Sequence, residues 1–343
     1  MIATRLTLVS SGRSSPLGSA VVEKRQLGRS GLRVSRMALG TMTWGGDTDA
    51  EEAASQLVAF VDAGGTLVDT ADIYGEGESE RVLGSLLGDL VPRDDVVVAT
   101  KAVARRTEGP FGGGASRGAL LTALDGSLKR LGTDHIDLWQ LHAWDTGVPL
   151  AETLSALEYA VTSGKVRYVG VSNYAGWQLA TAAAGAAAIA PIVSTQVEYS
   201  LLERGVDREV VPAAEHHGVG LLPWAPLGRG VLTGKYRTGT PADSRGANSA
   251  LAGYVEHHRT DRAARIVQAV ATAADGLGTS PLAVALAWVR DRPGVVAPVV
   301  GARDTGQLTG SLTAEAITLP PAIRSALDDV SAIEVGYPER WPR

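Results

Sequence analysis

The stretch TLVDTADIYGEGESERVLGSLL, residues 66–87, contains a short apolar run, a polar segment, a loop with two glycines and a stretch whose apolar residues recur at helical spacing. The apolar run predicts a buried strand over residues 66–71, and the helical spacing predicts a helix over residues 78–87. A strand that leads through a polar loop into a helix is the unit from which parallel sheets covered by helices are built.

The same unit recurs along the chain. Short apolar runs predict strands at residues 37–41, 66–71, 96–101, 136–142, 168–172, 194–197, 220–224 and 296–300. Amphipathic segments predict helices at residues 50–63, 78–87, 116–130, 150–162, 175–188, 208–217, 261–276 and 281–291. Eight apolar strands that alternate with helices predict an α/β fold, a (β/α)8 TIM barrel.

An open, doubly wound sheet is the alternative, and such a sheet is typically marked by G-x-G-x-x-G directly after its first strand. After the first predicted strand, Gly40, Gly45 and Gly46 have a different spacing. After the second, Gly75 and Gly77 lack the third glycine. The glycine pattern therefore favours the barrel.

Segments outside the repeat have predicted roles of their own. Residues 24–27 and 32–35 predict a β-hairpin that plugs the N-terminal mouth of the barrel. Residues 235–260 have no strand signal and predict a long loop over the C-terminal face, where it would act as a lid. Residues 1–22 predict a disordered leader rich in Ser and Gly, and residues 23–343 predict a single barrel domain.

The amino-acid composition restricts the classes of molecule that we expect the protein to bind. The chain has 37 acidic and 32 basic side chains, a net charge of -5, which provides no strong field for nucleic acid or an anionic membrane. It has no cysteine, which excludes disulfides, thiolate metal sites and thiol nucleophiles. No apolar run reaches about 18 residues and no secretory signal is evident, so we expect no membrane span and a cytoplasmic location. A small molecule is the expected partner, and a homo-oligomer stays open.

Polar residues stand where three neighbouring strands are predicted to end. Asp69 and Tyr74 follow the second strand, Lys101 ends the third and His142 ends the fourth. Each has an ordinary reading on its own: a helix cap, a packing ring, a lysine that reaches solvent or a structural histidine. Together they indicate a site, because functional groups of such barrels gather where strands lead into loops.

The motifs around these residues resemble the aldo-keto reductase family. DTADIYGEGESERVLG (69–84), ATK (99–101) and DLWQLH (137–142) are similar to three motifs of that family, and the likeness extends from about residue 23 to residue 327. The resemblance implies an NADPH-dependent reductase of aldehydes or ketones. It places a catalytic tetrad at Asp69, Tyr74, Lys101 and His142.

The resemblance also implies a role for each member of the tetrad. Hydride transfer to a carbonyl carbon leaves negative charge on the oxygen, which must receive a proton. Tyr74 is the expected donor, and Lys101, held by Asp69, is expected to favour the phenolate. His142 is expected to orient the substrate oxygen.

Cofactor and pocket residues follow from the same resemblance. Those expected to bind NADPH or NADP+ are Thr41, Met42, Ser172, Asn173, Gln196, Trp224, Ala225, Pro226, Leu227, Gly228, Arg229, Gly230, Lys235, Gly301, Arg303 and Gln307. Trp224 would stack on the nicotinamide, and Arg303 would bind the 2′-phosphate. Many members carry an acidic residue and an asparagine where this chain has Gly310 and Ser311, which weakens the prediction of a strict NADPH preference.

Trp44, Trp144 and Tyr254 are expected to line the substrate pocket. The histidine pairs at residues 216–217 and 257–258 have no obvious third ligand nearby, so we expect no metal site.

Three other functions stay open from the sequence. The chain could be an NADPH-binding regulatory module, as potassium-channel β subunits of this fold are. It could also be an isomerase or lyase that uses Asp69, Lys101 and His142 without a nicotinamide. A NADP-dependent alcohol or sugar dehydrogenase would use the same residues in the oxidative direction. The sequence does not identify the substrate.

Overall fold

The computed structural model describes residues 22–237, 239–241, 245–247, 252–334 and 336–337. The predicted leader, residues 1–22, lies outside the described residues except for Val22, which is buried and donates its backbone N–H to the carbonyl oxygen of Ala63 (3.3 Å). The predicted lid, residues 235–260, is described only in part.

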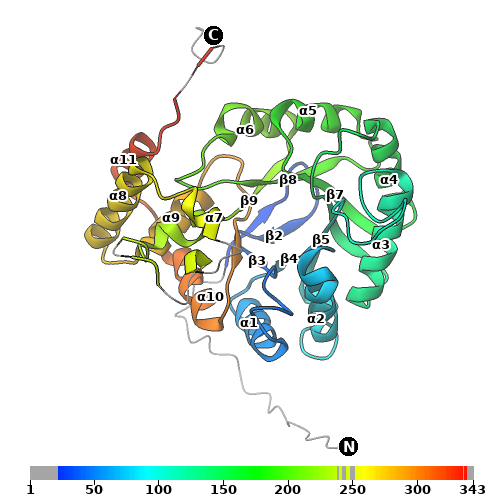
Figure 1. Cartoon of the computed structure of the whole chain (residues 1–343), viewed down its shortest axis with the longest axis horizontal. Coiled ribbons are helices and arrows are strands. Elements are labelled where there is room, and N and C mark those ends of the chain that lie inside the picture. The colour runs from blue at the N-terminus through cyan, green and yellow to red at the C-terminus, as the bar shows by residue number, and fades with distance from the viewer. Residues whose placement is uncertain (1–21, 238, 242–244, 248–251, 335, 338–343) are drawn as a thin grey trace, which may run out of the picture.

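Eight parallel strands form the barrel, seen from one end in Figure 1. They are β3 (Ala38–Gly40), β4 (Leu67–Asp69), β5 (Val97–Ala102), β6 (Ile136–Leu141), β7 (Val166–Ser172), β8 (Ile192–Glu198), β9 (Gly220–Trp224) and β10 (Val299–Gly301). Their order is β10-β3-β4-β5-β6-β7-β8-β9. The backbone of Leu221 in β9 bonds to Gly294 and Val296 at 2.9 Å each, which joins the two ends of the sheet just before β10. The predicted (β/α)8 barrel is confirmed.

Helices surround the strands, as Figure 1 shows. They are α1 (Ala50–Asp62), α2 (Glu78–Leu86), α3 (Arg117–Leu131), α4 (Leu150–Thr162), α5 (Gly176–Gly185), α6 (Val206–His217), α7 (Ala252–Glu256), α8 (Asp261–Leu277), α9 (Pro281–Arg290), α10 (Thr305–Leu312) and α11 (Pro321–Val330). Side chains of Asp49, Ser116 and Thr260 accept backbone N–H bonds at the start of α1, α3 and α8, which satisfies donors that the helix leaves open. The sequence analysis did not predict α7, α10 or α11.

The hairpin closes one end of the barrel interior, as predicted. It consists of the antiparallel pair β1 (Lys24–Gln26) and β2 (Arg33–Ser35). Leu27 and Val34 from this segment are 0% exposed and belong to the cluster of apolar side chains that fills the barrel. Gly28 has φ +55, and a Cβ there would lie 2.4 Å from the carbonyl oxygen of Val193, so the turn approaches the barrel wall closely.

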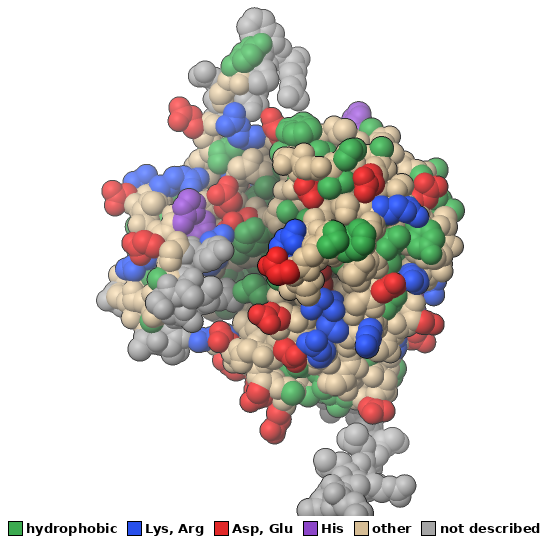
Figure 2. Space-filling model, turned by 45° about the vertical axis from the view of Figure 1, so that its right-hand side comes forward, with side chains coloured by type: hydrophobic (Ala, Val, Ile, Leu, Met, Phe, Trp, Pro, Cys, Tyr) green, Lys and Arg blue, Asp and Glu red, His purple; other side chains and the backbone are tan. Residues whose placement is uncertain are grey.

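The surface carries charges of both signs. On the face shown in Figure 2, acidic and basic side chains lie intermingled over much of the area. In the described part of the chain no single helix is long and apolar enough to span a membrane. α8 and α9 meet that criterion only together, and a bend of 102° separates them.

Packing inside the barrel yields a stability prediction at Gly170 of β7. A Cβ there would lie 2.1 Å from Ser194 Oγ and 3.0 Å from the Ser194 carbonyl oxygen. We expect Gly170→Ala to lower the free energy of unfolding by about 1–3 kcal/mol, because a packed interior resists added volume. Urea denaturation measures the change.

The matched control is Gly276→Ala in α8, where nothing lies within 4 Å of the added Cβ. Alanine there is expected to stabilise the helix by up to about 1 kcal/mol. A Gly170→Ala variant as stable as the wild type would contradict the packing argument.

Candidate active site

The structure brings the four predicted catalytic side chains together. Asp69 ends β4, Lys101 lies in β5, His142 follows β6, and Tyr74 opens the short helix η1 (Tyr74–Gly77). Lys101 Nζ lies 2.7 Å from Asp69 Oδ2 and 5.1 Å from the centre of the Tyr74 ring. The rings of Tyr74 and His142 meet edge to face, with centres 6.0 Å apart. A phenol, an ammonium group and an imidazole therefore converge at one place.

The ion pair between Lys101 and Asp69 is buried. Lys101 is 0% exposed and Asp69 is 2% exposed. Lys101 Nζ also donates to the carbonyl oxygen of Thr70 (2.8 Å), and Asp69 Oδ1 accepts from Gln196 Nε2 (2.8 Å). Burial lowers the pKa of Lys101, but the charges of Asp69 and Tyr74 outweigh it and hold that pKa above its ordinary value. The ammonium group therefore stays protonated at neutral pH.

Tyr74 stays a protonated phenol in this environment. Burial raises its pKa above the ordinary value of 10.0, and the positive charge of Lys101 opposes that shift only in part. The sequence analysis expected Lys101 to favour the phenolate, and Lys101 does act in this direction, but desolvation outweighs it. Tyr74 can therefore hold a proton until a stronger base, such as an alkoxide, forms beside it.

His142 is neutral. Burial, and then the charge of Lys101, lower its pKa from 6.5 to about 3. Its Nδ1 atom is buried and has no hydrogen-bond partner among the described residues. A neutral imidazole carries one N–H donor and one acceptor, so His142 suits hydrogen bonding to an oxygen atom without adding charge.

Four of the residues expected to bind NADPH form a connected network of hydrogen bonds. Trp224 Nε1 donates to Asn173 Oδ1, and Asn173 Nδ2 donates to the carbonyl oxygen of His142, both at 2.9 Å. Ser172 Oγ donates to the carbonyl oxygen of Gln196 (2.9 Å). Asn173 has φ +58, a left-handed conformation that asparagine tolerates. The ends of β6, β7, β8 and β9 are thus tied to the tetrad.

The turn after β9 contains several of the residues expected to bind NADPH. Gly228, Arg229 and Gly230 in η3 (Gly228–Thr233) all have positive φ, and Ala225 does as well. A Cβ at Gly230 would lie 3.2 Å from Lys235 Nζ, so a cation sits beside this turn. The N–H groups of Gly228 and Gly230 donate to the carbonyl oxygens of Ala225 (2.8 Å) and Leu227 (3.1 Å), so the cation beside the turn is the feature that suits an anionic group.

The side chain of Arg229 points elsewhere. Its Nη2 atom donates to Glu198 Oε2 (2.9 Å), and its guanidinium lies 5.6 Å from the centre of the Trp224 ring. His258 Nε2 lies 3.3 Å from the other carboxylate oxygen of Glu198. Glu198, which the sequence analysis did not single out, therefore connects the end of β8 to η3 and to the segment after α7.

Arg303, which was expected to bind the 2′-phosphate, lies just before α10. The backbone of Arg303 donates to Gln307 Oε1 (3.2 Å) and accepts from Thr48 Oγ1 (3.2 Å). Gln307 N donates to Asp304 Oδ1 (2.8 Å), which caps the helix. Gly301 is exposed just before this turn.

Two predicted cofactor residues near β3 differ in exposure. Thr41 is fully buried, and its hydroxyl pairs with Ser79 Oγ (2.7 Å) and with the carbonyl oxygen of Asp69 (3.2 Å). Met42 is 51% exposed. Thr41 thus supports the strand that carries Asp69, and Met42 has the exposure that a ligand contact requires.

The structure buries Trp44, which was expected to line the substrate pocket. Trp44 is 0% exposed and its Nε1 donates to Gln56 Oε1 of α1 (3.0 Å), because the loop after β3 folds its ring into the core. Trp144 is half-buried and packs edge to face on Tyr174 and Trp177, with ring centres 5.1 Å and 5.4 Å away. Tyr254 lies in α7, and its side chain is outside the described residues.

Asp72 is a candidate that the sequence analysis quoted but gave no role. It is fully buried, and burial together with the charge of Glu80 raises its pKa to about 7. Its position between Asp69 and Tyr74 in one motif was the available signal. Within the described residues, no three His, Asp or Glu side chains are grouped so as to hold a metal ion.

Comparisons with known proteins place the chain among oxidoreductases. Residues 36–332 match the sequence model of the Aldo/keto reductase family. The chain is 39% identical over 320 residues to the uncharacterised oxidoreductase YrpG of Bacillus subtilis, covering 90% of this chain and 96% of that protein. It is 35% identical over 326 residues to a probable voltage-gated potassium channel subunit beta of Oryza sativa subsp. japonica, covering 93% and 98%. It is 34% identical over 314 residues to the L-glyceraldehyde 3-phosphate reductase of Escherichia coli (strain K12), covering 85% and 87%.

The environment of His142 predicts a pH effect on stability. Because its folded pKa of about 3 lies below its ordinary 6.5, the unfolded chain binds a proton between these values that the folded chain does not bind. Wild-type stability should therefore fall, relative to that of His142→Gln, by about 2–3 kcal/mol as pH drops from about 6.5 to about 4.5. Urea denaturation at several pH values measures the difference.

The exposed His216→Gln variant is the matched control and should follow the wild type. Parallel pH curves for the wild type and His142→Gln would show that His142 is not held neutral by burial.

Proposed function

Because the chain belongs to the aldo/keto reductase family, we propose that it reduces an aldehyde or ketone to an alcohol, with NADPH as the hydride donor. The observation that carries the proposal is the convergence of Tyr74, Lys101 and His142 above a buried carboxylate. The proposal includes a cytoplasmic location and a small-molecule carbonyl substrate.

Tyr74 acts as the general acid. Bound NADPH would supply the hydride, which would leave the carbonyl oxygen as an alkoxide, a far stronger base than a phenolate. The raised pKa of Tyr74 is compatible with this role, because the phenol keeps its proton until the alkoxide develops. The proton then moves from the Tyr74 hydroxyl to the substrate oxygen.

Lys101 and His142 prepare the site for this transfer. The ammonium of Lys101 stabilises the phenolate that remains after Tyr74 has given up its proton. Asp69 holds that ammonium in place, and its own second oxygen is fixed by Gln196. His142, neutral at physiological pH, donates a hydrogen bond that orients the substrate oxygen.

Preference for NADPH over NADH depends mainly on Arg303 in this proposal. Ser311, at a position where many family members use an asparagine, is 3% exposed and its hydroxyl donates to the carbonyl oxygen of Gln307 (2.8 Å). Gly310 offers no side chain. A guanidinium binds phosphate in two-pronged fashion, so Arg303 is the residue that we assign to the 2′-phosphate.

A regulatory module that binds NADPH is the second candidate, supported by the similarity to the probable potassium channel subunit of Oryza sativa. The presence of all four catalytic side chains in one buried cluster favours the enzyme. The same residues serve alcohol oxidation, with Tyr74 as the base, so the direction of the reaction in the cell is part of what must be measured.

The first test replaces Tyr74 by Phe. We expect turnover to fall by about 10²–10⁴-fold, because the proton donor is lost, while NADPH affinity stays within about threefold. NADPH consumption with a panel of aldehydes and ketones measures turnover, and quenching of tryptophan fluorescence measures affinity. Near-normal turnover would remove Tyr74 from the donor role. A wild type that binds NADPH tightly but reduces no member of the panel would favour the regulatory module.

The second test replaces Arg303 by Ala. Loss of a charge-assisted hydrogen bond to phosphate should weaken NADPH binding by about 10- to 100-fold and NADH binding by less than about threefold. Dissociation constants from fluorescence titration measure both effects. Equal weakening of the two cofactors would show that the 2′-phosphate is bound elsewhere.

A further inference from the structure

A buried carboxyl group beside the site has no partner. The side chain of Asp72 is fully buried, and neither of its oxygen atoms has a hydrogen bond of normal geometry to a described residue; the backbone N–H of Ile73 lies near enough only to lower its pKa slightly. Its backbone N–H donates to the carbonyl oxygen of Lys101 (3.1 Å), so β5 faces Asp72 with a carbonyl group while the Lys101 ammonium is held by Asp69. An unpartnered carboxyl group destabilises a fold, so this position requires an explanation.

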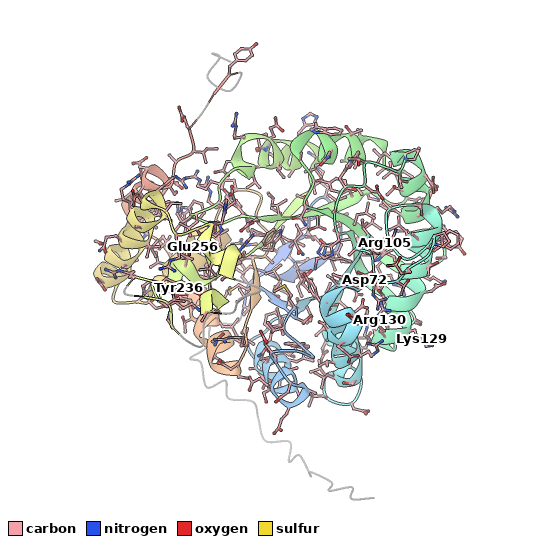
Figure 3. The ribbon with its side chains drawn as sticks, in the orientation of Figure 1. Asp72, Arg105, Lys129, Arg130, Tyr236 and Glu256 are labelled. Carbon is pink, nitrogen blue, oxygen red and sulfur yellow. The ribbon has the colours of Figure 1, made fainter. Side chains whose placement is uncertain are left out.

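Charged groups from three other elements face Asp72. They are Glu80 of α2, Arg130 of α3 and Arg106 of the loop between β5 and α3. Glu80 is fully buried and both of its oxygens are occupied, by Thr100 Oγ1 and by Arg130 Nε, at 2.6 Å each. Figure 3 shows Asp72 and Arg130 on the side of the barrel where α2 and α3 lie. The Nε atom of Arg130 is engaged with Glu80, whereas the Nε atom of Arg106 remains for Asp72.

Arg106 is the complementary group. Its Nη2 atom donates to the carbonyl oxygen of Glu76 (3.1 Å), whereas its Nε atom is buried without a hydrogen-bond partner in the described part of the chain. Arg106 and Arg130 both pack on Gly77, where a Cβ would lie 2.9 Å from Arg106 Nη2 and 2.7 Å from Arg130 Cδ. One unpartnered guanidinium N–H and one unpartnered carboxyl group therefore share a single cluster.

The loop that carries Arg106 begins at a strained residue. Val103 directly follows β5 and has φ +113, a conformation that β-branched residues rarely adopt. Gly114 N donates to the carbonyl oxygen of Val103 (2.7 Å) and closes the base of the loop. Strain of this kind persists only where surrounding contacts maintain it, and it clusters at segments that switch. The strained residue lies two positions after Lys101 in the chain.

We propose that Asp72 and Arg106 form a proton-controlled ion pair that positions the loop of residues 103–116 beside Tyr74. Ionised Asp72 accepts a hydrogen bond from Arg106 Nε and holds the loop against the turn of residues 72–77. Two carboxylates then balance two guanidinium groups. Protonation of Asp72 leaves one positive charge in excess and releases the loop. Asp72 and Arg106 are positioning residues.

The direction of the pH effect follows from the surroundings of Asp72. Burial, and next the charge of Glu80, raise its pKa to about 7, whereas Arg106 and Arg130 lower it. Pairing with Arg106 favours the charged form further, so the loop closes as pH rises through a midpoint at or below about 7.

Hydrogen–deuterium exchange of peptides from residues 103–116 in the full-length chain tests the pair without turnover. After correction for intrinsic rates, we expect about tenfold more protection at pH 8 than at pH 5.5 in the wild type, as the loss of one charge-assisted hydrogen bond implies. Asp72→Asn and Arg106→Gln should each lose the protection at pH 8. The double variant should lose no more than either single variant, and Arg106→Lys should restore part of it.

A second readout is the KM for the carbonyl substrate, and this one rests on the proposed function. We expect KM to rise at low pH in the wild type and to be high at every pH in Asp72→Asn, with a smaller change in kcat. Lys165→Gln, which removes an exposed ion pair to Asp125 (2.6 Å), is the matched control and should behave as the wild type.

Three outcomes would overturn the proposal: wild-type protection in Asp72→Asn or Arg106→Gln, additive losses in the double variant, or protection that is the same at both pH values. If Asp72→Asn does not fold, Arg106→Gln decides, because Arg106 lies in a partly exposed loop. If no carbonyl is reduced, the proposed function fails while the exchange experiment still tests the pair.

Discussion

The buried ion pair between Lys101 and Asp69 is the constraint on which the rest of the structure depends. Removing two charges from water is costly, and the cost is offset only when each charge has close partners. Here the Lys101 ammonium group donates hydrogen bonds to the Asp69 carboxylate and to the Thr70 carbonyl oxygen, and Gln196 donates one to the Asp69 carboxylate. Asp69 ends β4, Lys101 lies in β5 and Gln196 lies in β8, so the pair depends on these three strands facing the same interior. The fold and the catalytic cluster therefore specify one another.

Much of the fold could be predicted because the strands of a parallel barrel are buried and therefore appear in the sequence as apolar runs. All eight runs became strands, and the hairpin plug followed from its turn. The eighth strand was predicted at residues 296–300, yet regular pairing covers only Val299–Gly301, because the segment before it pairs across the barrel closure with Leu221. The helix α10 was not predicted, since Thr305–Leu312 contains two glycines and little helical periodicity.

The candidate site was predictable where chemistry depends on strand ends and unpredictable where it depends on packing. Residues at the ends of adjacent parallel strands must lie together, so the approach of Lys101 to Asp69 and Tyr74 followed from their order in the chain. Whether Trp44 faces a pocket or the core depends on the conformation of one loop, which the local sequence pattern does not predict. The raised pKa of Tyr74 likewise reflects burial, which only the assembled barrel determines.

Two carboxyl groups of the same motif, three residues apart, show how position sets chemistry. Asp69 lies 2.7 Å from the Lys101 ammonium group and holds it in place. Asp72 lies beyond the strand end, between α2 and α3, where Glu80 already occupies Thr100 and Arg130. A negative charge on Asp72 would be repelled by the charge of Glu80. Burial and this repulsion therefore both raise the pKa of Asp72. The turn that carries Tyr74 thus follows an aspartate paired with an ammonium group and contains a second aspartate whose charge changes near neutral pH.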